Sequence, residues 1–204
     1  IDKPVGWTSF DVVKKVRGIT KEKKVGHAGT LDPFASGVLI IGTGKDTKAL
    51  TSISSADKSY VAELTIGKTT DTLDPEGKII HLQAVPNLTF ESIKDKIISF
   101  LGTQDQVPPM FSAKKQNGTR LYKLARKNIV VDRKPIPIDI KKIELINLFK
   151  NRIIFSVCCS KGTYIRVLGM DIAEKLGTIG YLSSLRRTKV GYFDLKYSQT
   201  ISEF

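Results

Sequence analysis

Apolar residues near the start of the chain recur at the spacing of a helix. The apolar stripe consists of Val12, Val13, Val16 and Ile19. Thr8 stands just before this stripe as a candidate N-cap, and Asp11 follows three residues later. A threonine hydroxyl in that position can accept a hydrogen bond from the free N–H groups of the first helical turn. The pattern therefore predicts a helix over residues 9–18.

Two later stretches have the pattern of strands. Residues 58–66 alternate cleanly, and the side chains that share one face are Tyr60, Ala62, Leu64 and Ile66. Because successive side chains of a strand point to opposite faces, this stretch predicts a half-buried strand. Between Gly37 and Gly42 the run Val-Leu-Ile-Ile is uninterrupted, which predicts a buried strand.

The second half of the chain predicts more helices and strands. Thr89 precedes apolar residues at helical spacing, which are Phe90, Ile93, Ile97 and Leu101, and Gly102 should end this helix. Residues 104–120 are polar and contain Pro-Pro and Asn-Gly pairs, so they predict a long loop. The other predicted elements are strands near 137–148 and 152–160, a helix from about 163 to 176 ended by Gly177, and a strand at 188–195. Hairpin-like strands with separated helices indicate an α+β fold around a largely antiparallel sheet, whose strand order stays open.

The charge of the chain points to a polyanionic partner. The 204 residues include 33 Lys and Arg against 20 Asp and Glu, which gives a net charge of +13 and a pI near 9.7. Basic side chains that meet phosphates release condensed counterions, so such an excess favours nucleic acid. A generally basic, solubilising surface is the alternative. Charge alone does not distinguish DNA from RNA.

Composition also makes several classes of protein improbable. No apolar run approaches the roughly 20 residues of a membrane helix, and no signal segment opens the chain, so we expect a cytoplasmic protein. Cys158 and Cys159 are adjacent, which fits two reduced thiols on opposite faces of a strand. With only two histidines and no ligand cluster, we expect no metal. Dinucleotide-binding signatures are absent as well, so we expect no cofactor.

One segment has the composition of a functional turn. It reads Gly26-His-Ala-Gly-Thr-Leu-Asp-Pro33, and its glycines allow the backbone to approach a ligand closely. Pro33 disfavours the helical conformation at Asp32, so the backbone itself would hold this carboxylate in place. An Asp before Pro in a turn is more often structural than catalytic. Local chemistry therefore leaves the role of Asp32 open.

Further motifs follow in a fixed order along the chain. They are Lys3-Pro-Val-Gly-Trp-Thr-Ser9, Lys58-Ser-Tyr60, Gly67…Thr70-Asp-Thr72…Asp74…Gly77, Pro108-Pro-Met-Phe-Ser-Ala-Lys114, Gly118…Tyr122…Ala125-Arg126, Cys159-Ser-Lys-Gly-Thr-Tyr-Ile-Arg166 and Leu185-Arg-Arg-Thr188 with Val190-Gly191. Together with the segment at 26–33, this set resembles the TruB family of tRNA pseudouridine synthases over roughly residues 3–193. The resemblance implies the α+β pseudouridine synthase fold, with a mixed, mostly antiparallel sheet flanked by helices and loops and an RNA-binding cleft.

The resemblance also implies roles for individual residues. Asp32 matches the catalytic aspartate, Tyr60 the aromatic residue that stacks on the target uracil, and Arg166 the arginine that pairs with the aspartate. Leu185 matches a hydrophobic residue of the base pocket, and His27 a histidine that takes the place of the flipped base. The other matched substrate-binding residues are Asp74, which lines the active site in a less certain role, Lys58 and Tyr164. Residues 108–127 match a thumb-like insert that closes over the RNA.

Elementary chemistry supports these roles but also allows plainer ones. A uridine within a folded loop must be flipped out before an enzyme can reach it, and Tyr60 could then supply a stacking plane. The guanidinium of Arg166 could lower the pKa of Asp32 and keep it ionised. Without the resemblance, Tyr60 reads as an ordinary core residue and Arg166 as a phosphate contact. His27 could equally be a loop residue bonded to backbone.

The resemblance implies a reaction without cofactor or metal. Uridine 55 in the T-loop of tRNA would be isomerised to pseudouridine, with Asp32 as nucleophile or base, by a chain acting as a monomer. A glycosylase is a weaker alternative, because ordinary glycoside hydrolysis needs a second carboxylic acid. A non-catalytic tRNA-binding or folding protein, or a relative that depends on guide RNA, remains as well. Relatives usually carry a C-terminal PUA-type domain, so we expect residues 1–204 to be a catalytic domain with that domain absent or truncated.

Overall fold

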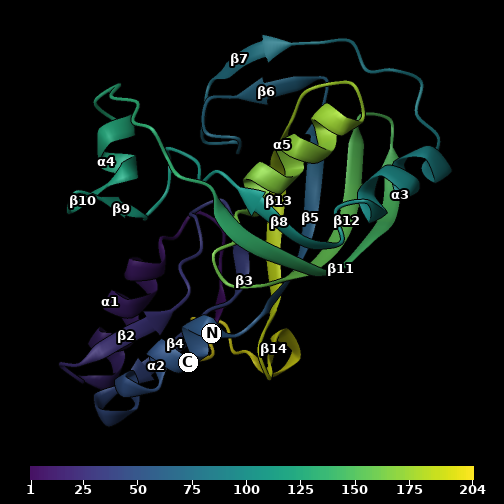
Figure 1. Cartoon of the computed structure of the whole chain (residues 1–204). Coiled ribbons are helices and arrows are strands. Elements are labelled where there is room, and N and C mark those ends of the chain that lie inside the picture. The colour runs from purple at the N-terminus through teal and green to yellow at the C-terminus, as the bar shows by residue number, and fades with distance from the viewer.

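The central strand of the main sheet, β5, lies between β13 and β12, which both come from the C-terminal third of the chain. The computed structural model describes residues 1–204, and the sheet order is β1-β3-β13-β5-β12-β11-β8, with β14 beside β13 (Figure 1). Its strands are β1 (Asp2–Lys3), β3 (Ser36–Val38), β5 (Lys58–Ile66), β8 (Gly102–Gln106), β11 (Ile136–Phe149), β12 (Arg152–Cys159), β13 (Gly180–Val190) and β14 (Phe193–Asp194). Only β3 and β13 pair in parallel, so the predicted α+β class with a mostly antiparallel sheet is confirmed.

Two helices cover one face of this sheet, α3 (Phe90–Ile98) and α5 (Ile165–Lys175) (Figure 1). Their apolar sides are buried against the strands in one core of 23 residues. Glycine allows α5 to lie close to β13, since a Cβ on Gly169 would come within 2.9 Å of Leu182 Cδ2. The close fit fixes the start of α5 relative to the sheet, and Arg166 lies in that first turn.

The N-terminal part forms a smaller lobe around a second apolar cluster. Its elements are α1 (Ser9–Thr20), β2 (Val25–Ala28), β4 (Ile40–Thr43), the 3-10 turn η1 (Gly44–Lys48) and α2 (Leu50–Ser55). Thr8 caps α1 in a capping box with Asp11. Val12, Val13 and Val16 pack in the cluster, whereas Ile19 is exposed. The predicted helix at 9–18 is confirmed, and it continues for two residues.

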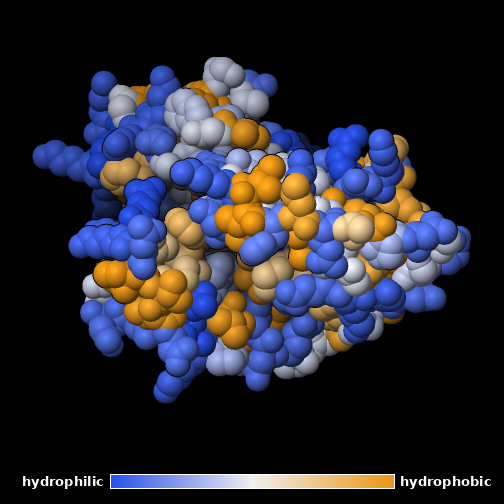
Figure 2. Space-filling model, turned by 90° about the horizontal axis from the view of Figure 1, so that it is seen from above, coloured by the Kyte–Doolittle hydropathy of each residue, from blue (hydrophilic) through white to orange (hydrophobic).

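Two excursions leave the main sheet. The hairpin of β6 (Lys68–Thr70) and β7 (Ile79–Leu82) runs across the top in Figure 1. The insert at 108–127 contains β9 (Lys115–Gln116), β10 (Thr119–Arg120) and α4 (Leu121–Ala125), and it projects beside the sheet. Seen from above, the surface is mostly hydrophilic, with apolar residues in separate patches (Figure 2). No helix is long and apolar enough to cross a membrane.

Several of the predicted elements match the structure. The strand at 58–66 has the predicted bounds, and the strands near 137–148 and 152–160 correspond to β11 and β12. The helix predicted at 163–176 corresponds to α5. Cys158 and Cys159 are both free thiols on β12, as expected.

Four other predictions were wrong in detail. The apolar run at 37–42 is not one strand, because it divides at Leu39 between β3 and β4, which belong to different sheets. Helix α3 ends at Ile98, and Leu101 lies beyond it with 47% of its surface exposed. The predicted loop at 104–120 contains the end of β8 and the β9–β10 hairpin. The strand expected at 188–195 is mostly turn and β14, since β13 ends at Val190.

Candidate active site

Asp32 lies in the loop between β2 and β3 and lines a cleft of about 290 Å³. The backbone on both sides of it is anchored. The Ser9 hydroxyl accepts a hydrogen bond from the Leu31 N–H at 2.9 Å and donates one to the Leu31 carbonyl at 3.1 Å. The buried ammonium of Lys3 donates to the carbonyl of Pro33 at 3.4 Å. The carboxylate is therefore presented by a loop that α1 and the N-terminal segment hold in place.

Arg166 connects Asp32 to two other parts of the chain. Its Nε lies 2.9 Å from Asp32 Oδ2, and its Nη1 lies 3.3 Å from Asp74 Oδ2. The same guanidinium donates to the carbonyls of Thr72 at 2.7 Å and Phe111 at 2.6 Å. Only 4% of the Arg166 side chain is exposed. One locked arginine thus joins the Asp32 loop, the β6–β7 hairpin and the start of the insert.

The pKa of Asp32 is raised above its usual value. Burial is the largest cause, and the nearby carboxylate of Asp74 adds to it, while Arg166 acts in the opposite direction. The Asp32 side chain keeps 38% of its surface exposed at the cleft, yet the protein around it still disfavours the charged form. We expected Arg166 to lower this pKa; the arginine does favour the ionised form, but burial outweighs it.

Asp74 is held at the turn between β6 and β7. Its Oδ1 accepts hydrogen bonds from the Thr72 hydroxyl at 2.6 Å and from the Glu76 N–H at 3.0 Å. Its backbone N–H and carbonyl both bond to the hydroxyl of Thr70. With its other oxygen on Arg166, this carboxylate is fully engaged within the protein.

The walls of the cleft come from neighbouring strands. Tyr60 on β5 and Leu185 on β13 are both buried and both line it. Arg187 on β13 lies directly across from Tyr60 in the strand pairing and lines the cleft as well. Burial raises the pKa of Tyr60, so its phenol stays neutral. The cleft therefore offers an aromatic side chain and an aliphatic side chain near the carboxylate, as a planar base would require.

Tyr164 and Lys58 complete the rim of the cleft. Tyr164 precedes α5, and its N–H and carbonyl are both bonded to the side-chain amide of buried Gln106. The ammonium of Lys58 donates to the carbonyls of Ser54 and Ala56, at 2.6 and 2.7 Å. Lys58 thus stabilises the end of α2 in this structure while its side chain lines the cleft.

The structure brings most of the sequence-derived residues together. The cleft is lined by Asp32, Lys58, Tyr60, Tyr164, Arg166 and Leu185. Asp74 does not line it but contacts Arg166 from behind. His27 lies on β2, outside the lining, with its Nδ1 buried and without a hydrogen-bond partner. Burial and the charge of Arg187 lower the pKa of His27 and favour the neutral ring.

Arg187, Ser112 and Gln106 are among the residues at or near the cleft that were not singled out from the sequence. Arg187 was noted only as part of a motif, Gln106 was assigned to a loop, and Ser112 to the insert. The structure places Arg187 and Ser112 in the lining and Gln106 behind Tyr164. The alternation of β13 could have indicated that Arg186 and Arg187 point to opposite faces.

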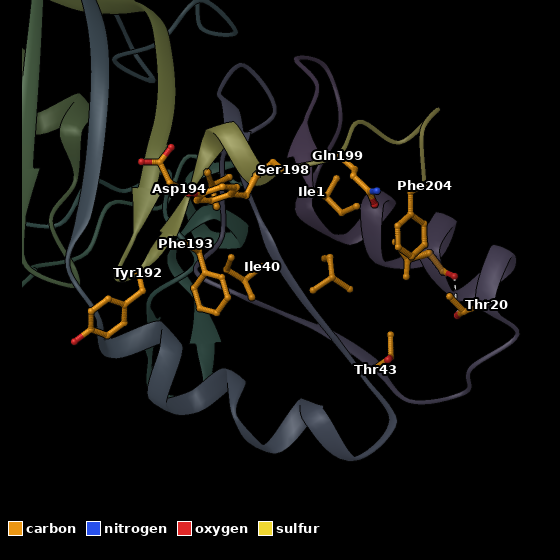
Figure 3. Close-up of a pocket in the computed structure, with 14 residues that line it drawn as sticks. Ile1, Thr20, Ile40, Thr43, Tyr192, Phe193, Asp194, Ser198, Gln199 and Phe204 are labelled. Carbon is orange, nitrogen blue, oxygen red and sulfur yellow. Dashed lines mark hydrogen bonds between the residues drawn. The ribbon is translucent and has the colours of Figure 1, made fainter.

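A larger cavity of about 490 Å³ lies away from this cleft, where the two chain ends meet (Figure 3). Its lining includes Ile1, Ile40, Phe193 and Phe204, and Asp194 is its only acidic side chain. Asp194 is used to cap the short turn that follows, through a bond from the Lys196 N–H. This cavity therefore lacks a reactive group, and nowhere do three His, Cys, Asp or Glu side chains gather as a metal site would require.

Comparison with known proteins identifies the family. The model of the N-terminal domain of the TruB family pseudouridylate synthases matches residues 17–165. The chain belongs to the TruB family. This TruB chain is 48% identical over 195 residues to tRNA pseudouridine synthase B of Clostridium kluyveri, covering 96% of this chain and 67% of the relative. The relative of the same name from Clostridium perfringens (strain ATCC 13124) is 50% identical over 194 residues, covering 95% and 66%. The TruB chain thus spans about two thirds of the length of these relatives.

Solved structures give the same family fold. A structure described as a Cbf5-Nop10-Gar1 complex superimposes with a TM-score of 0.74 and 30% identity, covering 95% of this TruB chain and 48% of that chain. An H/ACA RNP bound to a substrate RNA containing 2′-deoxyuridine gives a TM-score of 0.69 and 26% identity, covering 95% and 47%.

Proposed function

We propose that this TruB-family chain isomerises uridine to pseudouridine in tRNA, at uridine 55 of the T-loop. One observation carries the proposal: Asp32 contacts Arg166 at the cleft, with Tyr60 and Leu185 in the same lining. A carboxylate, its counter-charge and an aromatic side chain are what a flipped uridine requires. The relatives named tRNA pseudouridine synthase B support tRNA as the substrate.

In the proposed reaction the bond from N1 of uracil to C1′ breaks and a bond from C5 to C1′ forms. Asp32 acts as nucleophile, as carboxylates do in other covalent mechanisms, or as the base that triggers cleavage. Arg166 holds its carboxylate toward the cleft. Tyr60 stacks on the flipped base and Leu185 packs against it, so the detached uracil stays in the cleft and turns.

The insert at 108–127 would hold the T arm. Its exposed basic side chains include Lys123, Arg126 and Lys127, which can meet phosphates. Its first residues reach the cleft, because the carbonyl of Phe111 accepts a hydrogen bond from Arg166 and Ser112 belongs to the lining. Closure of the insert over the RNA would therefore be coupled to the position of the arginine.

Binding of the T arm by the insert at 108–127 can be tested by removing basic side chains from the insert. Replacing Lys123 and Lys127 by Ala should weaken tRNA binding and reduce the magnitude of the logarithmic salt slope by about 1 to 2 units. Lys94→Ala, at an exposed position on α3, serves as the control and should leave the slope unchanged. An unchanged slope in the double variant would remove the insert from the RNA-binding surface.

Two other functions are less well supported by the geometry. A hydrolytic glycosylase needs a second carboxylic acid free to act, and Asp74 is buried and bonded at both oxygens. A protein that only binds tRNA would not need the contact between Asp32 and Arg166.

The test uses unmodified tRNA labelled with tritium at C5 of its uridines. Pseudouridine formation replaces the C5–H bond, so the purified chain should release tritium to water without any partner. Asp32→Asn should bind the same tRNA but release none. If the unaltered chain binds tRNA but releases no tritium, the protein only binds tRNA and the proposed reaction is wrong. If Asp32→Asn releases tritium as fast as the unaltered chain, Asp32 does not take part in the reaction.

A further inference from the structure

Arg187 is a buried charge without an ion-pair partner. Only 1% of its surface is exposed, yet it belongs to none of the six ion pairs in the structure. Its Nε donates to the carbonyl of Val38 at 2.7 Å, and its Nη2 donates to the carbonyl of Gly29 at 2.8 Å. These carbonyls satisfy hydrogen bonds but carry no net charge. Burying a cation in this way is costly unless an anion joins it.

Arg187 faces the catalytic cleft. It is directly opposite Tyr60 in the pairing of β13 with β5, and both residues line the cleft with Asp32. The two carbonyls use two of the five N–H groups of the guanidinium, so donors remain for a ligand. Gly29 leaves it room, since a Cβ there would come within 3.3 Å of Arg187 Nη1.

The other cations around the cleft are already occupied. Arg166 is neutralised by Asp32 and Asp74, and the Lys58 ammonium is bound to two carbonyls. Lys3 is bound to carbonyls as well, and burial lowers its pKa to about 8. Arg187 is thus the arginine of the lining without a carboxylate partner, and it lies opposite Tyr60, on which the base is proposed to stack.

Resting on the proposed function, we propose that Arg187 is a further catalytic residue, which stabilises the negative charge on uracil while the base is detached from the ribose. When N1–C1′ breaks, the bonding electron pair stays with uracil, which becomes an anion shared between N1 and its carbonyl oxygens. The electron-deficient C1′ is meanwhile bonded by Asp32 or neutralised by loss of a C2′ proton, which returns later. Attack by C5 then forms the new bond. N1 takes up a proton and the C5 proton leaves to water.

This role explains why the charge is left unpaired before substrate binds. A carboxylate beside Arg187 would cancel its field in the ground state, whereas two carbonyls orient the guanidinium and leave its charge available. Donors that are already oriented toward developing charge contribute most to catalysis, because nothing has to reorganise during the reaction. A phosphate of the flipped nucleotide is the other anion that could meet Arg187, and the experiment separates the two.

The test compares Arg187→Lys with Arg187→Gln in the unaltered background. Both side chains keep hydrogen-bond donors for the carbonyls, but only lysine keeps the charge. Tritium release is followed in a single turnover with enzyme in saturating excess over tRNA, beside tRNA affinity and the thermal unfolding midpoint. Arg186→Gln is the matched control, because Arg186 is the neighbouring arginine, paired with Asp2 and outside the cleft lining.

We expect Arg187→Gln to lose about 10²–10³ in single-turnover rate, with tRNA affinity retained. Arg187→Lys should be at least about tenfold faster than Arg187→Gln, and Arg186→Gln should match the unaltered chain. Equal rates for the two Arg187 variants would overturn the proposal. Loss of affinity with a normal saturating rate would assign Arg187 to a phosphate and also overturn it. No tritium release from the unaltered chain would instead refute the proposed function itself.

Discussion

Asp32 and Arg166 form an ion pair in which the arginine side chain is buried, at 4% exposure, and the aspartate side chain is 38% exposed at the cleft. Their contact is a single one, from Nε to Oδ2 at 2.9 Å. The Nη groups of Arg166 contact the carboxylate of Asp74 and donate hydrogen bonds to the carbonyls of Thr72 and Phe111. One carboxylate oxygen of Asp32 therefore stays available to substrate while the other is fixed.

Arg166→Lys should show that geometry as well as charge is needed. An ammonium has three donors on a flexible stem and cannot replace a planar group that bonds to four partners. We expect tritium release to fall by about 10²-fold or more, as it does when one oriented electrostatic contact is removed. Measurement of tRNA affinity in parallel should show little change, and Arg152→Lys on the exposed end of β12 is the control. Full activity in Arg166→Lys would contradict the proposed positioning role.

The raised pKa of Asp32 predicts a pH dependence. If the ionised carboxylate is the reactive form, single-turnover rate should rise with pH through a pKa above the usual value of 3.8. Asp74 contributes to the raised pKa, so Asp74→Asn should move this acid limb to lower pH. The control is Asp105→Asn, at an exposed carboxylate on β8, which should leave the limb in place. A shift of the limb to higher pH in Asp74→Asn would show that loss of support for Arg166 dominates.

Substitutions of Tyr60 separate stacking from hydroxyl chemistry. Tyr60→Phe keeps the ring and should retain most of the activity, whereas Tyr60→Leu should lose roughly 1–3 kcal/mol of base stacking. The loss should be visible as slower tritium release at saturating enzyme. If Tyr60→Phe is as impaired as Tyr60→Leu, the hydroxyl rather than the plane is required.

The hydrogen bonds from Ser9 that hold the Asp32 loop can be removed without changing a residue of the cleft. Ser9→Ala deletes both hydrogen bonds to Leu31 within a buried setting, which should cost about 1–3 kcal/mol of folding stability. Because Asp32 follows Leu31 directly, the single-turnover rate should fall as well. Ser52→Ala, at an exposed position on α2, is the matched control for both thermal unfolding and rate. Unchanged activity in a destabilised Ser9→Ala chain would mean that other contacts suffice to place the loop.

The spacing of apolar residues predicted those elements that pack against one core along their whole length. Strand β5 is covered by one core on one face, so its alternation is unbroken and its bounds were correct. Strand β13 was misplaced because two register shifts, at 182–184 and at 187–189, interrupt its alternation. Strand β8 pairs with only one neighbour and is polar, so nothing in its composition distinguished it from a loop.

The site was predictable only through the family motifs. Asp32 and Arg166 are too distant in sequence for spacing to bring them together, and local chemistry made Asp32 an ordinary turn residue. Arg187 was missed for a different reason: a charged residue in a strand normally indicates a solvated face. The fold shows that this arginine is buried, because β3 pairs beside it and the Asp32 loop contacts it through the carbonyl of Gly29.

The placement of β5 also determines when the enzyme can exist during its own synthesis. Its two partners are residues 152–159 and 180–190, so both edges of the central strand stay unpaired until those later residues have left the ribosome. Exposed edges of this kind invite pairing with other chains. A nascent chain lacking those residues would also lack Arg166 and Arg187, so the cleft would form only after β13 has been synthesised. Slow translation of the segment between β5 and β13 should therefore favour aggregation of the nascent chain over folding.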